Sequence, residues 1–371
     1  MSQELPKESD FARIFIEQIP LLDVRAPIEF HAGAFPGSQN IPLLNDEERH
    51  LVGIRYKHHG QDAAIALGYT LVDAEKRQQR ITQWQKFFSE HPHGMLYCFR
   101  GGLRSRLTQS MLSTEAGISV PRIVGGYKAM RRFLINSLEH ESNRAKLIIL
   151  GGRTGSGKTP FIQTYSKMMD LEGIANHKGS AFGQEIDPQP SQIDIDHQVA
   201  IQLLRMNTRG VATPILIEDE GANIGARRVP DSLWQHMHKS PIIILEMPIE
   251  QRISQVFNDY ILSKRQQLSQ RLANEQTIQI HMRDELLQSL TQIQRRLGDE
   301  RFRSLNILAG TGMTEYFEQG RTEILKLLIK RMLVEYYDPM YDYQISKKNE
   351  RILFSGNEQS VREWLVAQSL V

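Results

Sequence analysis

Residues 146–159, KLIILGGRTGSGKT, decide the fold of the larger part of this chain. The run at 146–150 is apolar and is typical of a buried strand. Directly after it, residues 152–159 match the phosphate-loop pattern G-x-x-x-x-G-K-[ST] in full. A strand before the loop and a helix after it are the context in which backbone N–H groups surround phosphate oxygens. The stretch therefore predicts a polyphosphate site in an α/β domain.

The diphosphate-binding residues follow from the motif. Lys158 would contact the terminal phosphate oxygens, and the Thr159 hydroxyl could hold Mg²⁺. The motif does not distinguish a nucleoside triphosphate from a prenyl diphosphate, because both present the same anionic head. The residues that we assign to this site are Gly152, Gly155, Ser156, Gly157, Lys158 and Thr159.

Acidic residues follow a second apolar run, at 215–217. Glu218 and Asp219 come directly after it and are secondary candidates for carboxylates that hold a metal ion near the phosphate site. The alternative is a strand that ends in solvated acids. The sequence does not show which of the two side chains would face the phosphates.

Two domains are expected. In residues 10–140, apolar runs at 19–24, 95–97 and 122–124 alternate with helical patterns at 73–90 and 103–116, which predicts a parallel sheet. Residues 145–371 are predicted to be a P-loop NTPase-like α/β domain whose polar, Gln- and Arg-rich stretch at about 249–331 forms a helical extension. The charged segment at 139–146 would link them.

Composition excludes several classes. The 371 residues carry 45 Lys+Arg against 43 Asp+Glu, for a net charge of +2, so any nucleic-acid contact must come from local basic patches. The single Cys excludes an intrachain disulfide and an all-Cys metal site, and suggests a reducing compartment. No apolar run approaches the ~18 residues of a membrane span, and the N-terminus lacks a secretory pattern. We expect a cytoplasmic protein that contacts no membrane.

The lone cysteine heads residues 98–105, CFRGGLRS, between a predicted strand and a predicted helix. Backbone N–H groups, the helix N-terminus, Arg100 and Arg104 would all favour a thiolate at Cys98 and a tetrahedral anion beside it. Gly101 and Gly102 would let the backbone turn around that anion. This pattern suits a nucleophile that accepts a chalcogen atom or a phosphoryl group. The alternative is a buried structural cysteine.

Two chemistries share this arrangement. Sulfurtransferases of the rhodanese type place a cysteine at the head of an anion-binding loop, whereas cysteine phosphatases use C-x₅-R, which Cys98 to Arg104 also satisfies. The loop is one residue longer than the common rhodanese form, which leaves the phosphatase interpretation open and suggests a larger oxyanion than a thiosulfate-type donor.

A rhodanese-like region followed by a P-loop region, with the local motifs in this order, resembles the tRNA 2-selenouridine synthases. Gly221 stands where Ser is expected and Phe99 where Trp is usual, but neither departure touches Cys98 or Lys158. The matching stretches run along nearly the whole chain: residues 22–30, 48–53, 98–105, 125–128, 151–159, 171–180, 217–220 and 336–343.

The resemblance implies a tRNA-modifying transferase that converts wobble 2-thiouridine to 2-selenouridine. It implies geranylation of the sulfur by geranyl diphosphate, and then replacement of the S-geranyl group by selenium from selenophosphate. It also implies that Cys98 serves the selenium step, for which we expect a perselenide, while Lys158 serves the geranyl step. The expected macromolecular partner is the anticodon loop of tRNA, an unstacked RNA segment whose bases are accessible.

Other functions remain open from the sequence alone. The chain could be a P-loop kinase or ATPase fused to a sulfurtransferase, or a regulatory protein that uses the P-loop as a nucleotide switch. His177 is a secondary site candidate, ahead of His50 and His197, whereas Asp23 and Arg25 are expected to be structural. Basic and aromatic side chains that could contact RNA, or could equally be solvated or packed in the core, are Lys128, Arg131, Arg132, Lys264, Arg265, Arg295, Arg296, Arg301, Arg303, Tyr336, Tyr337, Tyr341 and Tyr343.

Overall fold

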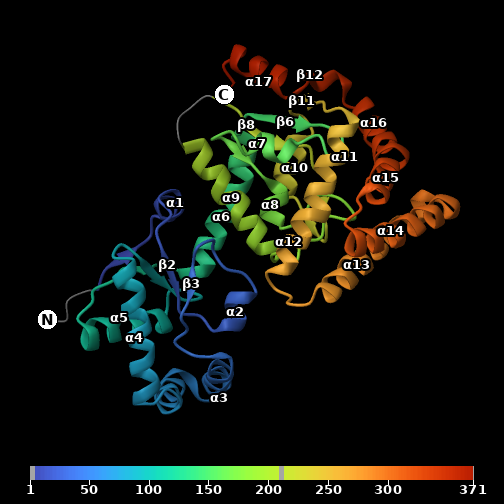
Figure 1. The fold of residues 1–371 in the computed structure, drawn as a ribbon. Helices are drawn as coiled ribbons and strands as arrows, with labels where there is room; N and C mark the ends of the chain where they lie inside the picture. The colour runs from blue at the N-terminus through green and yellow to red at the C-terminus, as the bar shows by residue number, and fades with distance from the viewer. Residues whose placement is uncertain (1–4, 209–212, 371) are drawn as a thin grey trace. The chain divides into compact units, whose positions relative to one another are not determined.

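The computed structural model describes residues 5–208 and 213–370 and divides the chain into two compact units. The first unit contains the described residues up to Glu141 together with Ser191 to Thr208, and the second contains the rest. Each unit is built on one five-stranded sheet in which every described pairing is parallel (Figure 1). The predicted α/β class with parallel sheets is thus confirmed.

The sheet of the first unit has the strand order β1-β5-β4-β2-β3. Alternate residues of β2 and β4 enter two different apolar clusters, Leu22 and Leu96 on one face and Leu21 and Met95 on the other, as expected for a sheet covered on both faces. Its strands are β1 (Lys7–Glu8), β2 (Leu21–Asp23), β3 (Gln39–Asn40), β4 (Met95–Tyr97) and β5 (Arg122–Ile123). Its helices are α1 (Phe11–Ile16), α2 (Pro27–His31), α3 (Asp46–Leu71), α4 (Ala74–Glu90), α5 (Leu103–Ala116), α6 (Gly126–Arg144) and α9 (Gln192–Thr208).

Helix α9 comes from the middle of the second sequence region but belongs to the first unit. Its residues Ala200, Ile201 and Leu204 are buried in the cluster that also holds Ile14 and Leu134. The amphipathic pattern of residues 192–208 predicts a helix but not the sheet against which it packs. This long-range placement therefore could not be read from the sequence.

The sheet of the second unit has the order β12-β11-β6-β8-β7, so β6 lies between β11 and β8. Its strands are β6 (Leu147–Gly151), β7 (Met168–Met169), β8 (Ile215–Glu218), β11 (Ile242–Leu245) and β12 (Ile352–Gly356), and a separate hairpin pairs β9 (Asn223–Ile224) with β10 (Arg227–Arg228). Shorter helices around this sheet are α7 (Lys158–Ile162), α8 (Leu171–Ala175), α10 (Asp231–Met237), η3 (Asn349–Arg351) and α17 (Glu358–Ala367).

The helical part of the second unit continues past the expected end at residue 331. The long helices α13 and α14 lie side by side (Figure 1) and bury a cluster that includes Leu290, Leu305 and Met313. The chain then returns to the sheet, where β12 pairs with β11. The sequence analysis did not predict β12. The helices are α11 (Ile249–Phe257), η1 (Asn258–Leu262), α12 (Ser263–Ser269), α13 (Glu275–Leu297), α14 (Asp299–Gln319), α15 (Glu323–Met332), η2 (Leu333–Tyr337) and α16 (Asp338–Ser346).

A pair of glycines brings the loop after β4 against the turn before α6. Gly126 has φ +57°, and a Cβ there would overlap the carbonyl oxygen of Cys98. Gly101, on the other side of this contact, has φ +61°, and a Cβ there would lie 2.7 Å from the backbone nitrogen of Gly125. Only glycine allows both the left-handed backbone and the close approach.

We predict that Gly126→Ala destabilises the protein by about 3 kcal/mol or more, because a methyl group would both strain the backbone and displace the Cys98 carbonyl. Gly117 is the matched control, since it has φ +68° but no atom within 4 Å of the place that a methyl group would occupy. Gly117→Ala should cost only about 1 to 2 kcal/mol. Urea unfolding measures both, and equal losses would show that the contact with Cys98 is not tight.

Candidate functional site

The phosphate loop connects β6 to α7, and its glycines hold it in a conformation that other residues rarely adopt. Gly155 and Gly157 have φ +78° and +81°, and a Cβ on Gly152 would lie 2.5 Å from the Ser156 hydroxyl. Lys158 Nζ donates to the carbonyl oxygen of Gly152 at 2.8 Å. The lysine thus lies folded over the loop, where phosphate oxygens would be held.

The loop keeps most of its amide donors unpaired. Among the described residues of the segment 154–159, only Ser156 uses its backbone N–H, which donates to Arg153 O at 3.0 Å. Because buried backbone donors nearly always find an acceptor, a run of unpaired N–H groups at a helix N-terminus is a binding site for an anion. The loop thus presents free amide donors, and the binding of a diphosphate to them stays a prediction.

An arginine that the sequence analysis did not identify holds this loop through a hydrogen bond to its backbone. Arg252 of α11 is 2% exposed and donates through Nε to the Thr154 carbonyl at 2.9 Å. Its two terminal nitrogens reach the Asp338 carboxylate at 2.9 and 2.5 Å. Arg153 donates through Nε and one terminal nitrogen to the Asp342 carboxylate, at 2.9 and 2.7 Å. The stretch 336–343, which we considered for its tyrosines, thus holds the loop through its aspartates.

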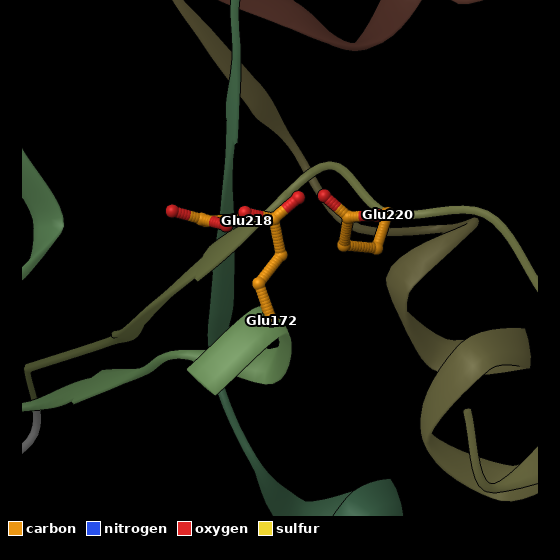
Figure 2. Close-up of side chains that lie close together, drawn as sticks. All are labelled: Glu172, Glu218 and Glu220. Atoms are coloured by element: carbon orange, nitrogen blue, oxygen red, sulfur yellow. The ribbon is translucent and has the colours of Figure 1, made fainter. Parts of the chain in front are cut away.

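Three carboxylates gather beside the loop. Glu218 at the end of β8, Glu220 in the following turn and Glu172 of α8 place carboxylate oxygens within 4.8 Å of one another, and in the view of Figure 2 the Glu172 carboxylate lies between the other two. Glu218 is 1% exposed, and both of its oxygens are buried without a hydrogen-bond partner in the described structure. Asp219 instead accepts from Lys348 Nζ at 2.7 and 2.8 Å. Glu218 and Asp219 therefore play different roles, which the sequence could not separate.

The electrostatics of the cluster follow from burial. Burial and the neighbouring Glu172 charge raise the pKa of Glu218 to about 7. Burial also raises the pKa of Glu172 and, well above its usual range, that of Glu220. Carboxylates that repel one another in a dry site favour a bound cation over three negative charges.

The phosphate loop, Glu172 and Glu220 line one cavity of about 1030 Å³, and the buried Glu218 is not among its lining residues. His177 lines it, with Nδ1 buried and unpartnered in the described structure, and burial lowers the pKa of this histidine. A smaller cavity of about 70 Å³ adjoins it, and its lining is almost wholly apolar. The two cavities share Thr154, Ser180, Val256, Tyr260 and Tyr337.

Cys98 lies at the head of a second loop with unpaired amides. The carbonyls of Cys98 and Phe99 accept hydrogen bonds from the backbone of Tyr127 and Lys128, each at 2.9 Å, so they point away from the loop's interior. Among the described residues, the N–H groups of residues 99–104 donate no hydrogen bond. Cys98 is only 3% exposed, and its Sγ contacts Ser105 Oγ at 3.2 Å. The thiol is buried, and the backbone beside it presents unpaired N–H groups of the kind that bind anions in other loops.

The arginines in and near this loop differ in their partners and in their exposure. Arg104 binds Glu29 through both terminal nitrogens, at 2.5 and 3.1 Å. Arg100 is exposed. Arg122, buried on β5, donates to the Gly101 carbonyl, a contact with the loop that sequence reasoning missed. The sequence signal for Arg122 was weak, because a single Arg at the start of a short strand is common.

Three other candidates lie away from the phosphate cavity. Arg25 donates to Asp23 and to the Gly33 carbonyl in a buried network, with Nε and its terminal nitrogen at 2.8 and 2.6 Å from Asp23 Oδ2. His197 is 1% exposed, its Nδ1 lies 2.8 Å from the Ala34 carbonyl, and burial lowers its pKa to about 4. His50 is exposed on α3. None of these side chains lines the phosphate cavity.

Comparison with known proteins identifies the family. A family model for the AAA domain of tRNA 2-selenouridine synthases matches residues 145–370. Curated relatives named tRNA 2-selenouridine synthase include those of Marinobacter nauticus, 44% identical over 97% of both chains, and of Cupriavidus pinatubonensis, 44% identical over 97% of this chain and 98% of the relative. The chain belongs to the tRNA 2-selenouridine synthase family. A third member, from Shewanella piezotolerans, is 43% identical over 99% of this chain and its own full length.

The resemblance drawn from the motifs is thus confirmed, and the chain is an enzyme of this family. Within the described residues, no helix is both long and apolar enough to cross a bilayer.

We predict that the apoprotein's stability depends on pH through Glu218. Its raised pKa means that it is protonated in the native state but ionised in the unfolded state between pH 4.5 and about 7, so its contribution to stability falls as pH rises through this window. With EDTA present, Glu218→Gln should gain about 1 to 3 kcal/mol relative to wild type between pH 5 and pH 8. Urea unfolding measures this gain, with exposed Glu250→Gln as control. A gain that does not change with pH would contradict the assignment.

Proposed function

We propose that this enzyme converts the wobble 2-thiouridine of tRNA to 2-selenouridine in two steps, geranylation of the sulfur and its replacement by selenium. The observation that carries the proposal is the apolar pocket that adjoins the phosphate cavity, because a phosphate site beside an apolar pocket suits a diphosphate with a hydrocarbon tail. The names of the curated relatives support the overall conversion. A tRNA substrate would place the reaction in the cytoplasm.

The small pocket has the size and character of a site for the end of a prenyl chain. Its volume of about 70 Å³ has room for roughly five water-sized groups, close to one isoprene unit. Every hydroxyl-bearing residue of the small pocket also lines the phosphate cavity. The far end of the small pocket therefore offers no polar partner to a nucleobase. The apolar residues of the far end are Leu286, Leu290, Leu325, Leu328, Ile329, Met332 and Leu333.

In the first step, the thiouridine sulfur attacks C1 of geranyl diphosphate. The S–C1 bond forms, the C1–O bond breaks, diphosphate leaves with the electron pair, and the base loses its N3 proton. Unpaired amides of the phosphate loop and the Lys158 ammonium stabilise the leaving diphosphate because its negative charge grows as the bond breaks.

The carboxylates beside the loop fit Mg²⁺. The two buried oxygens of Glu218, which no donor in the described structure satisfies, are hard oxygen ligands, and Glu172, Glu220 and the Thr159 hydroxyl supply more. When bound, such a cation supplies positive charge to the leaving diphosphate. Asp219 is held by Lys348 and is not part of this set.

In the second step, the loop at residues 98–104 binds selenophosphate, a tetrahedral oxyanion. Selenium attacks C2 of the S-geranylated base, the C2–Se bond forms, the C2–S bond breaks, and geranylthiolate leaves and takes a proton from water. The phosphoryl group then passes from selenium to the Cys98 thiolate, so that the S–P bond forms while the Se–P electron pair stays on the selenouridine. Water hydrolyses the phosphocysteine to phosphate.

Electron balance favours this role of Cys98 over the expected perselenide. Attack of the thiolate on selenium would break the Se–P bond and release phosphite, so phosphorus would gain two electrons. A thiol reductant would later be needed to free the selenium from the perselenide. Phosphoryl transfer needs neither, and it matches the C-x₅-R spacing of Cys98 and Arg104. We infer a rhodanese-like sheet for the first unit, with Cys98 at the carboxyl end of the strand β4 and a phosphatase-like chemistry in its loop.

We predict opposite effects for changes in the two loops. Cys98→Ser should keep geranylation and abolish 2-selenouridine, and a nucleoside that carries both selenium and phosphate should accumulate. Lys158→Ala should abolish geranylation but still convert tRNA that was geranylated chemically. Mass spectrometry of nucleosides from thiolated tRNA, after incubation with geranyl diphosphate and selenophosphate, measures both.

If Cys98→Ser stops instead at the S-geranyl stage, Cys98 delivers the selenium rather than accepting the phosphoryl group. Loss of both steps in a folded Cys98→Ser protein would contradict the division of labour. Turnover of ATP without any change in tRNA would favour a kinase or ATPase in place of the proposed function.

We also predict that Leu286→Trp raises KM for geranyl diphosphate about tenfold or more, because the indole would fill the small pocket. Inhibition by inorganic pyrophosphate should stay unchanged, since pyrophosphate has no tail. Leu287→Trp is the matched control, because Leu287 packs against the same helical core without lining the pocket. Equal effects of the two variants on KM would show that the tail lies elsewhere.

A further inference from the structure

The first unit contains an apolar cavity that the proposed reaction has not yet used. Its volume is about 520 Å³, within the range of small-molecule sites, and it is lined by α3 and by the beginning of α5. Helix α3 folds back at Gly60, where φ is +79° and ψ is −174°, so both of its arms contribute. We call this space the α3 cavity; Val52, Ile54, Ala64, Ile65 and Leu107 form its apolar wall.

The α3 cavity adjoins the Cys98 loop. Leu103 and Arg104, which end that loop and open α5, also line the cavity. Cys98 is buried in the same apolar cluster as Leu43, Leu44 and Met111, which are lining residues too. A group attached to an atom that reacts beside Cys98 could therefore extend into the cavity.

The charged side chains around the cavity indicate the kind of molecule to which its occupant is attached. The basic side chains of its lining are Arg49, His50, Lys57, Arg77 and Arg104, and the described lining itself contains no carboxylate. Just outside the lining, Glu29 pairs with Arg49 and Arg104, and Glu115 pairs with Arg77. Apolar side chains remain uncovered there in the described structure, since Ile54 is 46% and Tyr56 58% exposed. An apolar wall with a basic edge fits a hydrocarbon group that is attached to a polyanion.

We propose that the α3 cavity binds the geranyl group of S-geranyl-2-thiouridine in tRNA while C2 of that base is presented to the Cys98 loop. The inference rests on the proposed two-step function and adds a second hydrocarbon site, separate from the pocket beside the phosphate loop. The leaving sulfur is bonded both to C2 and to the geranyl chain, so binding of the chain positions C2. Burial of the chain also supplies affinity that a smaller S-alkyl group lacks.

The test compares two tRNAs, one carrying S-geranyl-2-thiouridine and one carrying chemically prepared S-methyl-2-thiouridine. Without selenophosphate, the full-length enzyme should bind the geranylated tRNA about tenfold or more tightly than the methylated tRNA in a filter-binding assay. With selenophosphate, KM should show the same preference. Ile65→Trp, which fills the cavity, and Ile54→Gln, which makes its exposed wall polar, should reduce the preference to less than about twofold and leave binding of the methylated tRNA unchanged.

Ile135→Gln is the matched control, because Ile135 is 53% exposed in the same unit but does not line the cavity. Leu286→Trp separates the two hydrocarbon sites: it should impair geranylation yet keep the preference for premade geranylated tRNA.

Loss of the preference in Leu286→Trp but not in the α3 cavity variants would overturn the inference and leave the proposed function standing. Equal weakening of both tRNAs by Ile54→Gln would show that the cavity contacts RNA or a second protein copy instead, which also overturns it. A wild-type enzyme that produces neither modified nucleoside would refute the proposed function itself.

Discussion

Backbone N–H groups without acceptors, held open at the carboxyl ends of parallel strands, are the constraint on which both candidate sites depend. In each loop the carbonyl groups are bound elsewhere: Arg252 holds the Thr154 carbonyl, and the backbone of Tyr127 and Lys128 holds those of Cys98 and Phe99. With the carbonyls fixed, the amides cannot turn away to find other partners. Unpaired amides carry a free-energy cost, which the proposed oxyanions would remove when they bind.

The two loops differ in what surrounds them, and that difference suits different steps. The phosphate loop faces a cluster of buried carboxylates, which would be unstable beside a phosphate unless a cation neutralised them. The Cys98 loop instead has Arg104, which pairs with Glu29, and the buried Arg122, which donates to the Gly101 carbonyl. In the proposed reaction, departure of diphosphate would call for a strong positive charge, whereas a thiolate nucleophile would have to stay unbound by the metal ion.

Local signals predicted the loops, and long-range contacts decided the rest. The phosphate motif and the Cys98 loop are short enough for their backbone conformation to follow from glycine spacing, and α5 begins and ends where the pattern predicts it, at Leu103 and Ala116. The distinction between Glu218 and Asp219 depends on Lys348, which lies 129 residues away from Asp219 in the sequence. The Arg252–Asp338 pair, the strand β12 and the packing of α9 likewise join distant segments, so no local pattern could reveal them.

The position of α9 has a consequence for how this enzyme can be divided. Because the helix is contributed to the first unit by a segment that interrupts the second, no single cut in the chain yields two complete units. A fragment that ended near residue 141 would lack one wall of its own core, and the complementary fragment would carry Ala200, Ile201 and Leu204 with nothing to cover them. During synthesis, the first unit must therefore wait for about 200 residues of chain before its core can close, so gene fusion and truncation in this family are expected to preserve the two regions together.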